Sequence, residues 1–229
     1  MRQVVDQRGS AALLFQYRHP QRPDFDEPDL TGERRQAYTD RLAPLPAVAS
    51  AWRVPDPIDD FAAYLPYVVL AEVLTDGDAS RLVRRLVQRD RTATSIGGYL
   101  GFMGEPFETR NPTAILLQAH LPPGGDVDKV LRTIDEENER IATDGLEPGE
   151  LERTVARMAT HLLRDTDAVL GRALRMAVLE QQRGNAALIN DLPRLLGEVT
   201  EEQIRSAAAL LRPQRRASVE VQVADGGTK

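Results

Sequence analysis

A nearly continuous apolar segment, PTAILLQAHL at residues 112–121, places the strongest constraint on the fold of this chain. It begins at a proline and is followed by Pro122-Pro123-Gly124-Gly125, so no helix extends through either end. A short apolar run between turn residues is typical of a strand buried inside a sheet. We therefore predict that residues 112–121 form a strand at the centre of a sheet.

The remaining segments predict more strands and a set of helices. Alternating or β-branched residues indicate strands, and apolar residues at helical spacing indicate helices. The order is two strands, two helices, two strands, several helices and one strand, which predicts an α/β (α+β) fold: an antiparallel-rich mixed sheet with helices packed on one face. The predicted strands are 33–41, 46–54, 92–102, 112–121 and 217–223; the predicted helices are 61–74, from 78 onwards, 127–144, 151–162, 167–183, 186–196 and 200–212.

These elements form one domain between two segments of different composition. Residues 1–32 contain Pro20, Pro23 and Pro28, which disfavour a helix and favour an extended arm or linker. Residues 225–229, DGGTK, favour a flexible tail. We therefore predict a linker at 1–32, a domain at 33–224 and a tail at 225–229.

Composition excludes several classes of function. The chain has no cysteine, which rules out disulfides, thiolate metal sites and a cysteine nucleophile. Its net charge of −6 argues against a nucleic-acid partner. Apolar runs are too short for a membrane span, and we expect a cytoplasmic protein without a membrane partner. The arginines at 81, 84, 85, 89 and 91 favour a solvated helix surface over a binding site.

No catalytic or metal-binding set of residues is evident. The histidines are His19, His120 and His161, far apart in the sequence, and only His161 stands in a suggestive segment. HLLRD at 161–165 has the spacing of the inverted zinc motif H-x-x-E-H, but Arg164 replaces the general base and would repel the cation. The sequence also lacks a G-x-S-x-G elbow and the phosphate-binding glycine motifs. We predict no catalytic residue and no metal ligand.

Four stretches resemble the second, non-zinc-binding domain of the insulinase/pitrilysin/mitochondrial-processing-peptidase family of zinc peptidases. In that family two similar halves form a clam-shell around a peptide, and only one half carries the zinc motif. The resemblance extends from about residue 33 to 223 and implies a half without zinc, whose zinc-bearing partner is another half. The stretches are PAVASAWRVPDP, YVVLAEVLTDGDASRLVRRLVQ, AILLQAHLPPGGDVDKVLRTIDEEN and DGLEPGELERTVARM.

The chain departs from this family at two positions. Non-zinc halves often carry an Arg and a Tyr seven residues apart that hold the substrate near the metal. The alignment places Val87 and Thr94 at these peptide-facing positions, so the pair is substituted here. A direct contribution to catalysis is therefore not expected.

Three functions remain open from the sequence. The first is a non-catalytic half or accessory subunit of an insulinase-like zinc metallopeptidase, which forms chamber wall and contacts a peptide and a zinc-bearing homologous half. The second is a peptidase-like structural or interaction module without a proteolytic role, paired as a homodimer or with another chain. The third is an independent hydrolase with an unrecognised site. No cofactor is expected in this chain, and zinc is expected only in a partner half.

Overall fold

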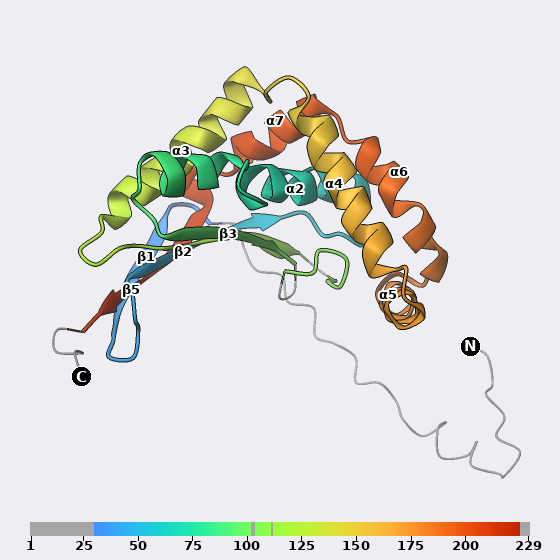
Figure 1. Ribbon diagram of the computed structural model, residues 1–229, viewed down its shortest axis with the longest axis horizontal. Helices are drawn as coiled ribbons and strands as arrows, with labels where there is room; N and C mark the ends of the chain where they lie inside the picture. Colours follow the sequence, from blue (N-terminus) through green and yellow to red (C-terminus); the bar gives the residue numbers. More distant parts are fainter. Residues whose placement is uncertain (1–29, 102–103, 111, 225–229) are drawn as a thin grey trace, which may run out of the picture.

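The computed structural model describes residues 30–101, 104–110 and 112–224 of the chain, and it contains one sheet covered by helices (Figure 1). The sheet has five strands in the order β1-β5-β2-β4-β3. β1 and β5 run parallel, and the other neighbours are antiparallel, which confirms the predicted mixed sheet. The strands are β1 (Arg34–Asp40), β2 (Ala47–Val54), β3 (Ser95–Leu100), β4 (Thr113–His120) and β5 (Arg216–Val223).

The predicted central place of the apolar strand is wrong by one position. β4 has neighbours on both sides, as expected, but β2 occupies the middle of the sheet. The reason is that β5 inserts between β1 and β2 and so moves the centre by one strand. Burial in β4 accordingly alternates, with Ile115, Leu117 and Ala119 facing the helices and the residues between them facing the other side.

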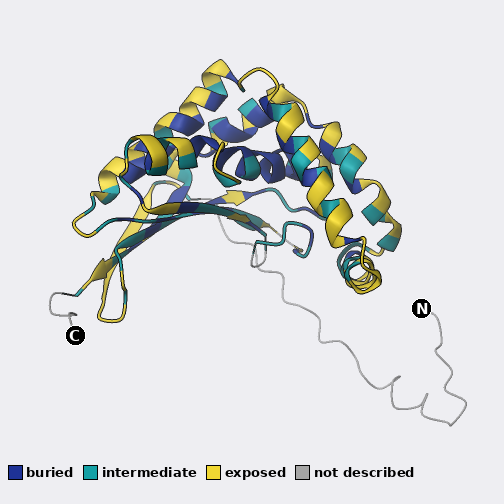
Figure 2. Ribbon diagram, viewed as in Figure 1, coloured by how far each residue is buried: buried dark blue, intermediate teal, exposed yellow. Residues whose placement is uncertain are grey.

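All described helices pack on the same face of the sheet (Figure 1). α2 lies directly on the sheet, and α3 contacts β1 and β5 through the Arg35–Asp128 and Arg216–Asp135 pairs, whereas α5 lies beyond one end of the sheet. Figure 2 shows the consequence: buried residues lie between the sheet and the helices, whereas the outer surfaces of the helices are exposed. The helices are α2 (Phe61–Thr75), α3 (Val127–Asp144), α4 (Glu150–Asp165), α5 (Val169–Arg183), α6 (Leu192–Gly197) and α7 (Glu201–Leu210), with short helices η2 (Ala186–Asn190) and η3 (Pro213–Arg215).

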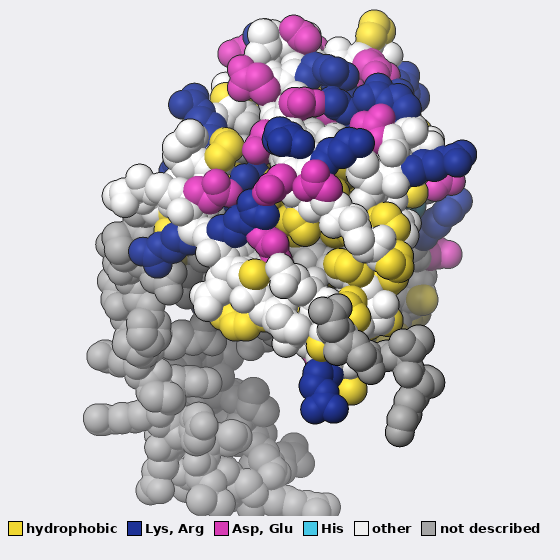
Figure 3. Space-filling model, turned by 90° about the vertical axis from the view of Figure 1, so that its left-hand side faces the viewer, with side chains coloured by type: hydrophobic (Ala, Val, Ile, Leu, Met, Phe, Trp, Pro, Cys, Tyr) yellow, Lys and Arg dark blue, Asp and Glu magenta, His cyan; other side chains and the backbone are white. Residues whose placement is uncertain are grey.

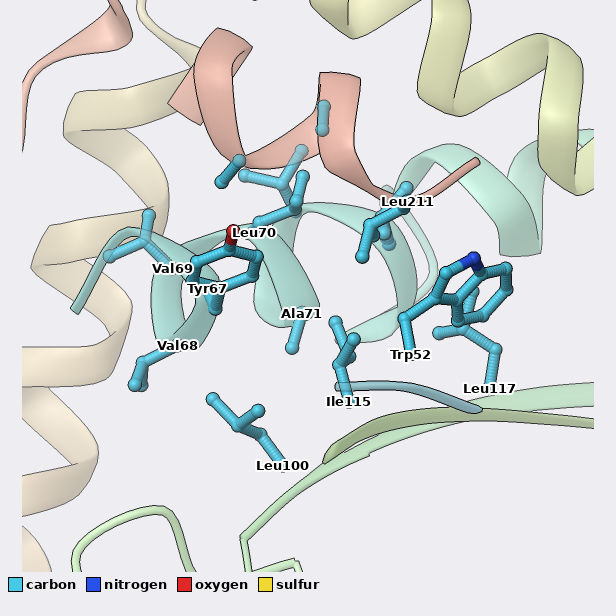
Figure 4. Close-up of a cluster of buried hydrophobic side chains, with 14 of the residues drawn as sticks. Trp52, Tyr67, Val68, Val69, Leu70, Ala71, Leu100, Ile115, Leu117 and Leu211 are labelled. Atoms are coloured by element: carbon cyan, nitrogen blue, oxygen red, sulfur yellow. The ribbon is translucent and has the colours of Figure 1, made fainter. Parts of the chain in front are cut away.

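α2 is the centre of the core because nearly all of its surface is apolar. Residues 64–71 are buried without interruption, as expected for a helix covered on every side. Its N-terminus is capped by Asp60, whose carboxylate accepts from the backbone N–H of Ala63 at 2.9 Å. Figure 4 shows side chains of this helix above Trp52, Leu100, Ile115 and Leu117 of the sheet.

The second predicted helix differs from the structure. The sequence predicts an α-helix from Asp78. Instead, only residues 81 and 82 are α-helical, and they are followed by η1 (Val83–Arg89), a π-helix. The N–H of Asp90 donates to the carbonyl of Arg85, and the N–H groups of Thr92 and Ala93 both lie within hydrogen-bond distance of the carbonyl of Leu86. Through these hydrogen bonds the chain passes from η1 into β3 without an intervening helix. Short π-helical segments are frequent at functional sites.

Candidate functional site

The face of the sheet opposite the helices is unusually apolar. Antiparallel sheets with one solvated face normally carry polar residues there. Here the open sheet face of the three middle strands consists mostly of small and aliphatic side chains, half-buried except for exposed Val219. This composition favours a surface that is covered by another part or partner. The residues that define the open sheet face are Ala47, Ala49, Ala51, Ala114, Leu116, Ala217, Val219 and Val221.

Two tyrosines flank the open sheet face. Tyr38 of β1 is in register with Val221, which is in register with Ala47, and Tyr99 of β3 is in register with Leu116. Their exposed fractions are 52% and 45%. Tyrosine offers an apolar ring and a polar hydroxyl, a combination enriched at protein interfaces. The same face also carries Arg53, Gln118 and His120, and Gln118 is in register with Ala49. The face therefore combines an apolar surface with a few polar groups, which suits contact with an extended peptide or another protein surface.

Val87 and Thr94, the predicted peptide-facing residues, lie at the two ends of the junction between η1 and β3. Val87 is partly buried and packs against the hydrophobic core. Thr94 is exposed, and both its N–H (2.8 Å) and its hydroxyl (3.1 Å) donate to the carbonyl of His120 at the end of β4. Their role toward a peptide stays a prediction.

The arginine cluster is more buried than the sequence suggested. Arg81 is 5% exposed and its guanidinium makes a bidentate pair with Glu150, at 2.9 and 2.6 Å. Arg85 bridges to Glu137 at 2.7 Å and also contacts Glu136. These arginines, with Arg84, Arg89 and Arg140, line a cavity of about 450 Å³ that also contains carboxylates. Figure 3 likewise shows basic and acidic side chains interspersed over the helical part of the surface. The five arginines of the lining outnumber its three carboxylates, Glu137, Asp144 and Glu147, but each arginine already pairs with a carboxylate.

His161 and Asp165 share a small cavity but do not form a metal site. The cavity, about 150 Å³, is also lined by Glu72, Glu105 and Arg175, and the guanidinium of Arg175 would repel a cation. Within the described residues, no three His, Asp or Glu side chains are grouped so that they could hold a metal ion. Zinc therefore does not fit the residues present in this part of the chain. His19 lies outside the described residues.

Glu72 is a half-buried acid that the sequence analysis did not identify. It lies on the otherwise apolar α2, beside Asp76, whose Oδ2 is 2.6 Å from Nε of Arg157 on α4. Burial, together with the hydrogen bond and the negative charge of Asp76, raises the pKa of Glu72 to about 7. A lone acid within an apolar helical run is the sequence signal that could have identified it.

Comparison with solved structures shows the same fold in several bacterial proteins. A protease from Helicobacter pylori is similar over 90% of this chain and 48% of its own, with 14% identity and a TM-score of 0.78. A conserved protein from Enterococcus faecalis V583 is similar over 96% of this chain and 50% of its own, with 16% identity and a TM-score of 0.73. A peptidase M16 inactive domain from Pseudomonas fluorescens gives 16% identity, 92% and 48% coverage, and a TM-score of 0.64. The chain thus spans about half the length of these proteins.

The family comparison agrees with this fold. None of the curated proteins compared with the chain matches it. Among the described residues, no helix combines the length and the apolar character needed to cross a membrane. The family model described as the peptidase M16 inactive domain matches residues 5–158, about two thirds of the 229 residues. The chain therefore belongs to the peptidase M16 family of insulinase-type zinc peptidases, as an inactive domain that carries no catalytic zinc.

Proposed function

We propose that this chain is the non-catalytic half of a two-part zinc peptidase, whose open sheet face forms part of the chamber wall. The observation that carries this proposal is the apolar composition of the open sheet face, which an isolated antiparallel sheet does not require. Two of the solved structures that are similar to this chain are about twice its length, which leaves room for a second half in each of them. A zinc-bearing homologous half supplies the metal, and this chain supplies surface for the peptide and the partner.

The test combines the chain with the product of an adjacent reading frame that encodes H-x-x-E-H. We expect the mixture to contain zinc and to cleave a fluorogenic peptide library faster than the zinc-bearing half alone. Ala51→Glu should abolish this gain, because the carboxylate would enter the apolar centre of the open sheet face, next to Leu116 and Ala217. Ala62→Glu is the matched control: it lies exposed in the first turn of α2, where an acid is favourable.

A second function, an interaction module without a proteolytic role, predicts a different outcome. In that case the chain still binds its partner through the open sheet face, and Ala51→Glu weakens binding, but peptide cleavage does not depend on the chain. The substitution of the family Arg and Tyr by Val87 and Thr94 favours this alternative. The cytoplasmic location expected from the sequence also remains a prediction, which fractionation of the native cells would test.

A further inference from the structure

The N-terminal half of α5 is a helix surface that the rest of the domain leaves uncovered. Of its fifteen residues, only Leu179 is fully buried. Apart from contacts with the turn that joins it to α4, α5 is held from its middle and its C-terminal end: Arg175 bonds to Glu105 at 2.9 Å, and Arg183 stacks over Phe61 at 4.1 Å and donates to the carbonyl of Pro57. Figure 1 shows α5 at one end of the molecule, below α4 and beyond the sheet.

The exposed side of this segment is apolar, whereas the solvent-facing side of a surface helix normally carries polar and charged residues. Val169 is 87% exposed, Leu170 71% and Leu174 59%. They share one side of the helix with the exposed alanines at 173 and 177, since positions three, four and seven apart lie together. We name these five residues the α5 stripe. A helix with apolar residues on both its inner and its outer side is normally buried all round.

The α5 stripe is held rigidly enough to act as a docking surface. Gly171 lets α5 approach the end of α4 closely, because a Cβ at this position would lie 2.1 Å from the carbonyl oxygen of Asp165. The guanidinium of Arg172 donates to the carbonyl of Thr166 at 3.0 Å, which ties the first turn of α5 to the preceding turn. Little conformational entropy is therefore lost when the stripe is covered.

We propose that the α5 stripe pairs with the α5 stripe of a second copy of this chain, in an antiparallel arrangement about a two-fold axis. An axis between Ala173 and Leu174 places Leu170 opposite Ala177, and Leu174 opposite Ala173, so that each large side chain meets a small one. The α5 stripe contains no charged residue, so no like charges meet at the centre of the contact. A symmetric contact of this kind closes at two copies.

The area of the surface also suits a second copy. The exposed apolar side chains of α5 present roughly 500 Å², near the upper end of what monomers leave uncovered. Full burial of this surface in both copies would remove about 1,000 Å² from water, which is below the size of standard stable interfaces and therefore fits a weak, reversible dimer. The α5 stripe is separate from the open sheet face, so this pairing goes beyond the proposed function and leaves that face available.

Sedimentation velocity over a concentration series of the full chain tests the pairing. We expect a reversible dimer whose dissociation constant increases at least tenfold in Leu174→Glu, while the melting temperature of the monomer stays unchanged. Leu42→Glu is the matched control, because Leu42 is 89% exposed on the loop between β1 and β2 and lies outside the α5 stripe. The dissociation constant of this control should equal that of the unsubstituted chain.

The absence of cysteine allows a second measurement. Ala173→Cys, next to the proposed axis, should form a disulfide-linked dimer on mild oxidation, whereas Ala177→Cys, whose counterpart is Leu170, should not. A chain that stays monomeric throughout the series overturns the proposal, as does a dimer that is unaffected by Leu174→Glu. A large loss of melting temperature in Leu174→Glu would also overturn it, since the α5 stripe would then be covered within the chain.

Discussion

Glu72 shows how one half-buried carboxyl makes the stability of this domain depend on pH. Its folded-state pKa of about 7 lies above the ordinary value of 4.5, so the folded state binds the proton more tightly than the unfolded state. The associated stability is fully present below pH 4.5 and is lost as the pH rises to about 7. Because the site is partly solvated, we expect a change of about 2 kcal/mol in the free energy of unfolding.

Glu72→Gln tests this expectation. The amide is neutral at every pH and still bonds to Asp76. The free energy of unfolding, measured by urea titration, should therefore no longer decrease between pH 6 and 7.5, and it should be higher than that of the unsubstituted chain at pH 8. The pKa of Asp135 is also raised, to about 6, chiefly by burial, and contributes below this window. An unchanged pH slope in the variant would assign the dependence to another group.

Arg91 carries the positive-φ strain of the η1–β3 junction. Its φ of 50° is the left-handed conformation, which costs an L-residue about 1–2 kcal/mol. Arg91→Gly removes this cost. Glycine also loses more conformational entropy on folding, which costs about 0.5–1 kcal/mol, so we expect a small net gain in thermal stability. Arg91→Ala keeps the strain and should show no such gain. A lower melting temperature for the glycine variant than for the alanine variant would contradict the expectation.

At the scale of elements, the buried Arg81–Glu150 pair connects the residues just before η1 to the first residue of α4. Arg81→Met leaves the Glu150 carboxylate buried without its cation and should cost about 3–5 kcal/mol. The double variant Arg81→Met, Glu150→Gln should recover part of this loss, since no buried charge remains. Arg84→Met, which breaks an exposed pair with Glu147, should cost less than about 1 kcal/mol in the same urea titration. Equal losses in both single variants would mean that burial of the pair is unimportant.

Elements with a strong local signal were predictable from the sequence. The capping box at Thr200 begins α7 as expected, and PAVASAWRV gives β2 with its alternating burial. The π-helix was not predictable, because its hydrogen bonds depend on where β3 takes up the chain. The strand order likewise depends on β5, whose position is set by pairing with residues far away in the sequence.

The candidate site was only partly predictable for a similar reason. The alanines of β2 indicated an apolar strand but not which face is left open, since this depends on where the helices pack. The solvated surface expected for the arginines was wrong for Arg81, because its carboxylate partner is 69 residues away. Likewise, the amphipathic pattern of α5 does not reveal that its second apolar side lacks a neighbour.

At the scale of the whole molecule, the chain should bind no stoichiometric zinc and cleave no peptide by itself. A zinc peptidase requires about three protein ligands and a carboxylate base, and the only suggestive segment pairs His161 with Arg164 in place of that base. Elemental analysis of the purified chain is the measurement. One zinc per chain, lost in His161→Ala, would show that the sequence reasoning about this helix is mistaken.

The position of β5 has a consequence for how the protein folds during synthesis. β1 and β2 are neighbours in sequence, yet they never pair; each pairs with β5, as in the contacts Arg34–Ala217 and Ala47–Val221. More than 160 further residues must therefore be synthesised after β2 before either pairing forms. Until then, the edge of β2 that later pairs with β5 has free N–H and C=O groups, which can pair with strands of other nascent chains. Cellular yield should thus depend more on chaperone capacity than on the final stability of the domain.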